Sequence, residues 1–401
     1  MDNGKARTVL CLASYEKGEA LLDELKRLGK HVVLLTISEL ENAPWPREVI
    51  DELFVMPELV GADDLLHGVS YLARTRDIER VIPLDDYDVL TAAYLREHLR
   101  LPGLGVSGAR LVRDKLAMRV AALAAGVLVP DFVHVLNHDR IRAFTELVPP
   151  PWVLKPRMEV SSIGITRVER EEDLWPRVEA LGDRQSHFLL ERYVPGSVYH
   201  VDSIVYRGQV LFAEAHGYAR PPMDVFHGGG IAMSRTLERG SEDAQLLQVL
   251  NRDVLGALEM RDGIAHLEMI KSHGDGQFHF LEVGARVGGA NTAEMVEAAT
   301  GINLWREWAR LEVLGDAYRI PARAERYGGV ILSLARQEHP DTSGYTDREI
   351  DYRVNKHHHV GFVLCADAPD RIHELQESYS RRIAEDFAAT MPAWQERPPN
   401  G

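Results

Sequence analysis

Short apolar runs and longer amphipathic stretches alternate along the first hundred residues. The apolar runs, which predict buried strands, are TVLCLA at 8–13, HVVLLT at 31–36 and RVIPL at 80–84. The stretches between them predict helices, at 16–29, around 63–75 and around 88–98. Strands that alternate with helices build parallel sheets with helices on both faces. The pattern therefore predicts a three-layer parallel α/β domain over residues 1–112.

The rest of the chain changes to mixed patterns and predicts three further units. Residues 113–190 open with a predicted helix from Asp114 to Gly126 and form a small α+β lobe. Residues 191–318 form a larger lobe, in which FLLERYVPGSVYHVDSIV reads as strand, Pro-Gly break and strand. Residues 319–401 form a C-terminal α+β extension, and the last dozen residues predict a disordered tail. The fold class is thus α/β and α+β.

The segment WVLKPRMEVSSIGITRV, residues 152–168, has the composition of a phosphate-binding loop. Lys155 supplies a positive charge at a strand end, and Ser161, Ser162 and Gly164 supply hydroxyls and backbone N–H groups in a small turn. No glycine-lysine-serine run follows, so this is not a Walker loop. Alone, the segment is also compatible with an ordinary strand–turn–strand hairpin.

Two carboxylates stand on a predicted hairpin further along, in GIAHLEMIKSHGDGQFHFLEVGARVGGA. Glu268 and Glu282 are hard oxygen ligands of the kind that magnesium takes together with substrate phosphates. Arg286 follows them as a donor for developing negative charge, before the pair Gly288-Gly289.

The register of this hairpin decides whether the carboxylates converge. A two-residue turn at Asp275-Gly276 would pair Glu268 with Val283 and send the two carboxylates to opposite faces. A longer odd-numbered loop with Gly276 in a left-handed conformation, or a bulge, pairs Glu268 with Glu282. We predict this second arrangement, because shared metal binding requires it.

In their order along the chain, these features resemble the ATP-grasp superfamily. Within it, the likeness is to carboxylate–amine ligases of the L-amino-acid ligase (dipeptide synthase) and carnosine synthase kind. The resemblance implies an ATP-grasp fold behind an N-terminal pre-ATP-grasp domain, with ATP and Mg²⁺, or Mn²⁺, as cofactors. It implies that Lys115, Lys155 and the loop with Ser161, Ser162 and Gly164 bind phosphates, that Glu191, Arg192, Tyr193 and Val194 read adenine, that Glu268 and Glu282 hold the metal, and that Arg286 steadies the acyl phosphate.

Two positions depart from the family pattern. Where many members carry a ribose-binding glutamate this chain has Val198, and where many carry a metal-binding asparagine it has Gly284. Asp202 is the candidate that could replace the ribose-binding glutamate. Water can replace the asparagine, because magnesium keeps several waters.

Several remaining residues are candidates for substrate binding. Arg220 and His227 lie in HGYARPPMDVFHGGG, which reads either as a surface loop or as a substrate loop whose arginine pairs a carboxylate. His266 faces the same side of its strand as Glu268 and is either a partner of the metal site or a core histidine. With Arg286, Gly288 and Gly289 they make up the predicted substrate site.

Other features favour ordinary structural roles. In His357-His358-His359 only two of three side chains can share one face of a strand, which favours a solvated strand edge over a metal tract. Cys11 and Cys365 lie far apart in the sequence, in apolar strand-like segments, which favours buried free thiols. No leader-like segment opens the chain, so a cytoplasmic location is expected.

Composition limits the partners. With 46 basic and 61 acidic residues the net charge is −15, which argues against nucleic acid and anionic membranes. The expected partners are a small-molecule carboxylate and an amine, with a homodimer left open. The expected reaction is ATP-dependent amide formation through an acyl phosphate. Another ATP-grasp reaction such as a biotin- or purine-type carboxylation, a silent ATP-binding regulatory protein, and a plain structural α/β protein are the alternatives.

Overall fold

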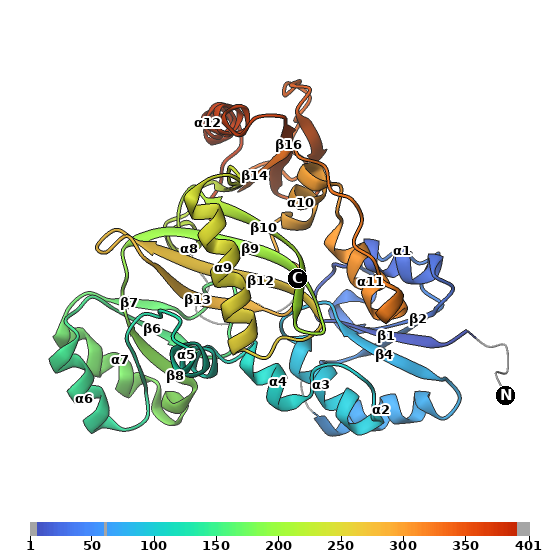
Figure 1. The fold of residues 1–401 in the computed structure, drawn as a ribbon, viewed down its shortest axis with the longest axis horizontal. Coiled ribbons are helices and arrows are strands. Elements are labelled where there is room, and N and C mark those ends of the chain that lie inside the picture. Colours follow the sequence, from blue (N-terminus) through green and yellow to red (C-terminus); the bar gives the residue numbers. More distant parts are fainter. Residues whose placement is uncertain (1–5, 60–61, 391–401) are drawn as a thin grey trace.

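A computed structural model describes residues 6–59 and 62–390 of the chain. The predicted disordered tail lies mostly outside these residues. Figure 1 shows the N-terminal unit and the small lobe on either side of a large central sheet, with the C-terminal strands above it. Within the described part, no helix combines the length and apolar content needed to cross a bilayer.

The N-terminal unit is the parallel three-layer domain that the sequence predicts. Its sheet has the order β3-β2-β1-β4, and every pairing is parallel. The strands are β1 Thr8–Ala13, β2 His31–Ile37, β3 Glu52–Met56 and β4 Ile78–Pro83. The covering helices are α1 Glu19–Arg27, α2 Ala62–Ala73 and α3 Asp88–Leu99, and α4 Val106–Leu111 follows. All six residues of β1 are buried, as the central strand of a covered sheet requires.

A four-stranded antiparallel sheet of order β5-β8-β6-β7 forms the small lobe. Its strands are β5 Phe132–His134, β6 Trp152–Pro156, β7 Thr166–Val168 and β8 Phe188–Arg192, and its helices are α6 His138–Leu147 and α7 Leu174–Ala180. Helix α5, Lys115–Ala124, begins at Asp114 as predicted, because the Asp114 carboxylate accepts the N–H groups of Leu116 and Ala117. Met118 and Ala122 of α5 pack into the core of the large lobe, not into that of the small lobe.

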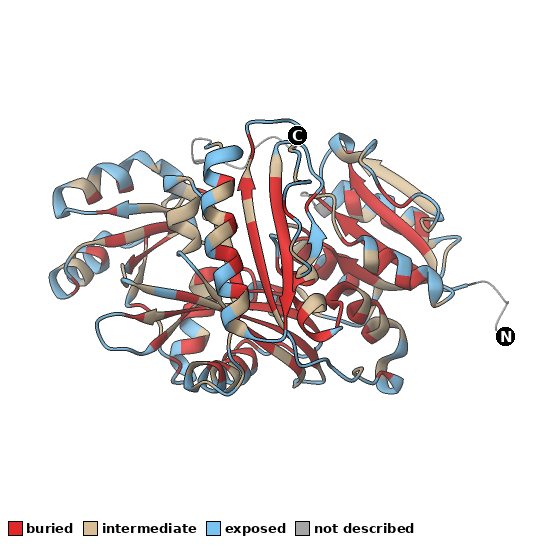
Figure 2. Ribbon diagram, turned by 90° about the horizontal axis from the view of Figure 1, so that it is seen from above, coloured by how far each residue is buried: buried red, intermediate tan, exposed pale blue. Residues whose placement is uncertain are grey.

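The large lobe is built on one eight-stranded sheet of order β13-β12-β9-β10-β11-β14-β16-β15. Its strands are β9 Gly196–Tyr206, β10 Gln209–Tyr218, β11 Ala232–Thr236, β12 Gly263–Ser272, β13 Phe278–Gly284, β14 Tyr327–Leu334, β15 Ile350–Arg353 and β16 His359–Ala366. Strand β14 pairs directly with β11, so the C-terminal strands continue this sheet and do not form a separate one. Figure 2 shows buried residues concentrated along the strands and exposed residues on the outer sides of the helices.

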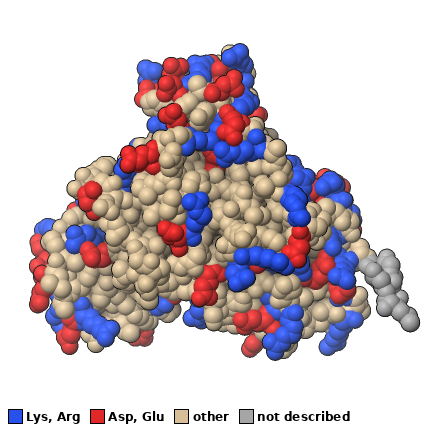
Figure 3. Space-filling model, viewed as in Figure 1, with Lys and Arg blue, Asp and Glu red and all other residues tan. Residues whose placement is uncertain are grey.

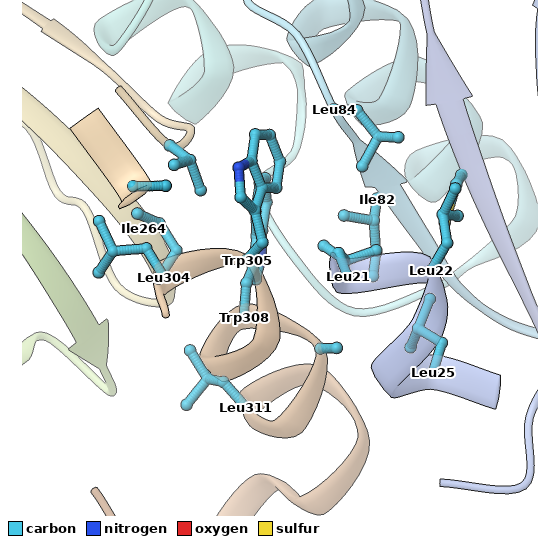
Figure 4. Close-up of a cluster of buried hydrophobic side chains, with 14 of the residues drawn as sticks. Leu21, Leu22, Leu25, Ile82, Leu84, Ile264, Leu304, Trp305, Trp308 and Leu311 are labelled. Carbon is cyan, nitrogen blue, oxygen red and sulfur yellow. The ribbon is translucent and has the colours of Figure 1, made fainter. Parts of the chain in front are cut away.

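Six helices accompany this sheet, and one of them joins it to the N-terminal unit. They are α8 Pro222–Gly228, α9 Glu242–Ala257, α10 Thr292–Thr300, α11 Leu304–Leu314 and α12 Pro369–Asp386, with α5 beside α9. Four short 3₁₀ turns lie at Ser38–Leu40, Glu171–Asp173, Gly182–His187 and Gly315–Ala317. Helix α11 packs against α1, where Trp305 and Trp308 meet the leucines of α1 (Figure 4). The N-terminal unit and the large lobe therefore share one hydrophobic core.

Candidate active site

A cleft between the small lobe and the large sheet brings most of the predicted residues together. Its cavity volume is about 140 Å³. Its wall includes Lys115, Lys155, Ser162, the 191–194 segment, Val198, Glu268 and Glu282. These residues come from α5, β6, the loop after β6, β8 and its continuation, β9, β12 and β13, so the cleft exists only in the folded chain.

Lys155 lies at the end of β6 and is held by a buried acid. Its Nζ is 2.6 Å from Glu191 Oε2 on the adjacent strand β8. Burial lowers the pKa of Lys155, and the nearby carboxylate of Glu191 only partly offsets this, so the pKa falls to about 8. Arg119 on α5 donates to the other oxygen of Glu191 at 2.7 Å. Arg119 was not recognised in the sequence, because it lies in an otherwise ordinary helix.

The predicted phosphate loop adopts the tight conformation that its composition suggests. Ser161, Ser162 and Gly164 have φ values of 53°, 59° and 68°. These values lie in the left-handed region, which residues other than glycine seldom adopt. Such turns point successive N–H groups toward one side and form anion-binding concavities. Lys115 Nζ donates to the backbone carbonyl of Glu159 at 2.5 Å, which ties the loop to α5.

The hairpin places Glu268 and Glu282 opposite each other, as predicted. Residues 273–276 form a four-residue loop closed by the bond from Ser272 N–H to the Gln277 carbonyl, with Gly276 at φ 71°. That loop alone would leave Glu282 out of register. A bulge at Leu281 shifts the pairing, so that Glu268 opposes Glu282 while Met269 opposes Phe280. The bulge is the alternative that restores a shared face.

Both carboxylates have protein partners in the cleft. Glu282 Oε2 is 2.9 Å from Lys115 Nζ; burial opposes ionisation of Glu282, but this cationic neighbour keeps its pKa low. Glu268 Oε1 accepts the hydroxyl of Tyr218 at 2.9 Å. Two carboxylates on neighbouring strands, beside two lysines suited to phosphate, are the donor set that Mg²⁺ uses with a nucleotide. The residues present therefore fit the metal.

Arg286 follows the hairpin and contacts the N-terminal unit. Its Nε is 2.5 Å from Asp86 Oδ2, and Arg113 approaches the other oxygen of Asp86 at 3.8 Å. Burial alone would lower the pKa of Arg286, but Asp86 outweighs it and raises that pKa. A Cβ at Gly284 would lie 3.1 Å from Asp86 Oδ1, so Asp86 fills the space of the missing asparagine.

Comparison with known proteins identifies this arrangement. Residues 148–294, which include Lys155, Glu268, Glu282 and Arg286, match the profile of the ATP-grasp domain. The chain therefore contains a segment that matches the ATP-grasp domain. The L-amino acid ligase of Bacillus licheniformis has the same fold, with a TM-score of 0.75 at 19% identity over 98% of this chain and 100% of the other.

Two curated relatives are also ligases. The L-arginine-specific L-amino acid ligase of Bacillus subtilis is 23% identical over 68% of this chain and 67% of its own length. The D-alanine–D-alanine ligase of Nitrosomonas europaea is 29% identical over 25% of this chain and 33% of its own length. The second match therefore spans only a third of that relative.

The segment predicted to read adenine borders the cleft. Arg192 ends β8, Tyr193 and Val194 follow it, and the side chain of Glu191 contacts Lys155 and Arg119. Val198, at the position of the usual ribose-binding glutamate, contributes an apolar wall and is 4% exposed. At positions 198 and 284, where the chain departs from the family pattern, packed neighbours thus occupy the space of the usual polar side chain.

Asp202 does not take the ribose role that the sequence suggested. It is fully buried and is not part of the cleft wall. Its two oxygens lie 2.7 Å from His200 Nδ1 and 2.9 Å from His266 Nδ1. The suggestion failed because Asp202, although it shares a face of β9 with Val198, lies further along the strand, where it contacts His200 of β9 and His266 of β12.

His266 and the two glycines lie next to the metal-binding face. His266 Nε2 is 3.7 Å from Glu268 Oε1; burial opposes its charge, but Asp202 raises its pKa to about 9. A Cβ at Gly288 would lie 2.8 Å from His266 Nδ1, so only glycine fits there, while Gly289 has open space beside it.

The remaining candidates lie in the 216–230 segment and on the surface. Arg220 is exposed, and α8, which follows it, supplies cleft wall through Pro222, Met223 and Asp224. The side chain of His227 lies outside the described part of the structure. His357 and His358 stand in an exposed turn before β16, and both cysteines are buried free thiols.

Proposed function

We propose that this protein is an ATP-dependent carboxylate–amine ligase that joins amino-acid-like substrates and releases ADP and phosphate. The observation that carries the proposal is the convergence of Lys115, Lys155, Glu268 and Glu282 on one cleft, with Arg286 next to them. The ligases found by comparison support the same reaction class. The cytoplasmic location and the homodimer stay predictions.

The two lysines and the phosphate loop bind the triphosphate of ATP. Lys155 is pre-positioned by Glu191 and Lys115 by Glu282, so neither side chain has to be ordered when the nucleotide binds. Backbone of Tyr193 and Val194 borders the site for the base. Glu268 and Glu282 would hold Mg²⁺, which supplies positive charge at the phosphates.

The substrate carboxylate attacks the γ-phosphorus of ATP, the bond from phosphorus to the ADP oxygen breaks, and an acyl phosphate forms. An amine then attacks the acyl carbon and loses a proton, and phosphate leaves. Arg286, held by Asp86, stabilises the negative oxygen that develops on the acyl carbon. The reaction needs no side-chain nucleophile. The small lobe, which closes one side of the cleft, excludes water from the acyl phosphate.

Hydroxylamine tests the reaction class. With an accepted acid, ATP, Mg²⁺ and no amine, hydroxylamine should trap the acyl phosphate as a hydroxamate, with ADP as the nucleotide product. A phosphate-release screen over pairs of amino acids identifies the acid and the amine. AMP and pyrophosphate as products would replace the acyl phosphate by an adenylate, and stimulation by bicarbonate instead of amino acids would indicate a carboxylation.

A further inference from the structure

A row of buried polar side chains runs from Glu268 into the large sheet. Strands β12 and β9 pair so that His266 opposes Asp202 and Glu268 opposes His200. Because residues two apart on a strand share a face, these four side chains lie on the same side of the sheet. Asp202 and His200 are fully buried, and His266 is 8% exposed. The row therefore connects a proposed metal ligand to the interior.

The contacts from Ser234 to His266 are hydrogen bonds, and the approach of His266 to Glu268 is longer. Asp202 Oδ1 is 2.9 Å from His266 Nδ1, and Asp202 Oδ2 is 2.7 Å from His200 Nδ1. His200 Nε2 is 2.7 Å from Ser234 Oγ on β11. At the other end, His266 Nε2 and the Tyr218 hydroxyl both approach Oε1 of Glu268, at 3.7 and 2.9 Å. Two neighbours on one oxygen fix the torsion of that carboxylate.

We propose that Asp202 is a positioning residue for Glu268, which it orients through the imidazole of His266. This inference rests on the proposed role of Glu268 in metal binding. Asp202 accepts a hydrogen bond from His266 Nδ1 and so fixes the plane of the ring. The Nε2 atom of the ring then faces the Glu268 carboxylate and limits its rotation. Partners of this kind orient metal ligands, and their loss typically weakens metal affinity by about 10–100-fold.

The packing of Gly288 supports a fixed geometry. A Cβ there would lie 2.8 Å from His266 Nδ1, 2.9 Å from Asp202 Oδ1 and 3.0 Å from Thr292 Cβ. The backbone after the hairpin thus lies directly on the contact between His266 and Asp202. A side chain at position 288 would therefore displace His266 or Asp202 from this contact.

The same residues invite a second interpretation, as a metal site of their own. His200, Asp202 and His266 offer ligand atoms within 4.8 Å of one another, and both nitrogens of the buried His216 lack a hydrogen-bond partner. However, two ligands of one tetrahedral zinc lie about 3.3 Å apart. The separations of 2.7 and 2.9 Å are those of hydrogen bonds. We therefore favour the hydrogen-bonded row.

The test compares Asp202→Asn with the parent protein in two measurements. Mn²⁺ is titrated into the complex with a non-hydrolysable ATP analogue and followed by electron paramagnetic resonance, and the Mg²⁺ dependence of turnover is measured separately. We expect the Kd for Mn²⁺ and the half-saturating Mg²⁺ concentration to rise about tenfold or more. At saturating Mg²⁺ most of kcat should return. A Kd equal to that of the parent would overturn the proposal.

Glu214→Gln is the matched control. Glu214 lies directly opposite Asp202 on β10, is equally buried, and pairs with Arg239 at 2.9 Å and Arg323 at 3.2 Å, away from the row. Its loss should lower thermal stability without changing the Kd for Mn²⁺. If Glu214→Gln weakens Mn²⁺ as much as Asp202→Asn does, the effect is general destabilisation and the proposal fails.

A second variant tests the proposal in case Asp202→Asn does not fold. His266→Asn keeps an amide near Asp202 and removes the atoms that face Glu268, so it should weaken Mn²⁺ to a similar extent. Glu268→Gln separates this inference from the proposed function. If Glu268→Gln weakens Mn²⁺ and neither variant of the row does, only the positioning role fails; if Glu268→Gln has no effect, the metal site itself fails. Stoichiometric zinc in the purified protein that Asp202→Asn abolishes would replace positioning by a metal site.

Discussion

Three cations of the site are each paired with a buried or partly buried acid. Lys155 pairs with Glu191, Lys115 with Glu282, and Arg286 with Asp86, at 2.6, 2.9 and 2.5 Å. Unpaired buried charges cost several kcal/mol, so these acids stabilise the cations while the cleft holds no anion. The pairing also orients the cations, and it lets nucleotide phosphates share charges that are already in place.

Lys155→Ala tests the phosphate contact at this scale. Loss of one charge-assisted contact, worth about 1.5–3 kcal/mol, should lower ATP affinity roughly tenfold to a hundredfold. Isothermal titration calorimetry measures the affinity. Lys271→Ala, which removes an equal charge paired with Asp243 outside the cleft wall, should leave it unchanged. ATP binding to Lys155→Ala at parental strength would refute the phosphate role.

The lowered pKa of Lys155 predicts a pH dependence of ATP binding. Bound phosphates favour the protonated lysine, so the pKa of Lys155 rises from about 8 in the complex, and binding takes up protons near pH 8. Affinity should therefore fall as pH rises from about 8 toward the higher pKa of the complex. Calorimetry in two buffers of different ionisation enthalpy measures the uptake. Lys155→Arg should bind without this proton uptake, and uptake that persists in that variant would assign it to another group.

Glu282→Gln tests the metal site. The variant keeps the volume but removes a charge from the pair of carboxylates, so magnesium-dependent turnover should fall by roughly a hundredfold. Asp275→Asn, at the tip of the same hairpin, is the control and should keep full turnover. Full turnover in Glu282→Gln would show that the two-carboxylate site is not needed.

Sequence reasoning identified the residues of the cleft better than their partners. Lys155, Glu268 and Glu282 were found because local patterns of strand, turn and charge surround them. Arg119 and Asp86 were missed, because their partners lie far away in the sequence. Arg119 and Glu191 are 72 residues apart, Asp86 and Arg286 are 200 residues apart, and no local pattern records such a separation. Asp202 was misassigned for a related reason. Its neighbours on β12 and β9 follow from strand order, which periodicity does not supply.

At the scale of elements, short backbone irregularities decide where side chains point. The bulge at Leu281 corrects the register of the hairpin, and left-handed residues shape the phosphate loop. In residues 1–112, the strands β1, β2 and β4 and the helices α1 to α3 were predictable, because their periodicity is strong and local, whereas β3 and α4 were not predicted. The continuation of the large sheet into β14 and β16 was not, since the pairing of β11 with β14 joins segments about a hundred residues apart.

The start of α3 provides a prediction at this scale. Asp88 is fully buried and accepts from Ser14 N–H at 3.0 Å and Ser14 Oγ at 2.5 Å. Burial, with a contribution from Asp85, raises its pKa to about 7. The folded state then binds a proton that the unfolded state has released, so this group's contribution to stability is lost as pH rises from about 4 through 7.

Asp88→Asn should remove that loss. At pH 8 the variant should be more stable than the parent by about 2–4 kcal/mol, because an amide needs no ionisation in a buried site. Urea unfolding at pH 5 and pH 8 measures the difference. Equal pH dependence of stability in parent and variant would show that Asp88 is ionised in the folded protein across this range.

At the scale of the molecule, the surface charges show no division of the protein, whereas the hydrophobic cores divide it into two parts. On the face seen in Figure 3, basic and acidic residues are interspersed, and no basic stripe of the kind that binds nucleic acid stands out. The small lobe has a core of its own, with Trp152 and Leu154 at its centre. The N-terminal unit and the large lobe share theirs, through α1 and α11. The division predicts one rigid body that carries Glu268, Glu282 and Asp86, and a second that carries Lys155.

Two leucines test this division. Leu25 of α1 is fully buried in the shared core, and Leu154 of β6 is 3% exposed in the core of the small lobe. Either change to alanine should cost about 2–5 kcal/mol. In Leu25→Ala, calorimetry should show the main transition at lower temperature, and hydrogen exchange should rise in both the N-terminal unit and the large lobe. In Leu154→Ala, exchange should rise in the small lobe alone, and ATP affinity should fall because β6 carries Lys155.

Faster exchange in Leu25→Ala confined to residues 1–112 would show that the N-terminal unit unfolds by itself. The small lobe would then close on two independent bodies, and Asp86 could not hold Arg286 in place.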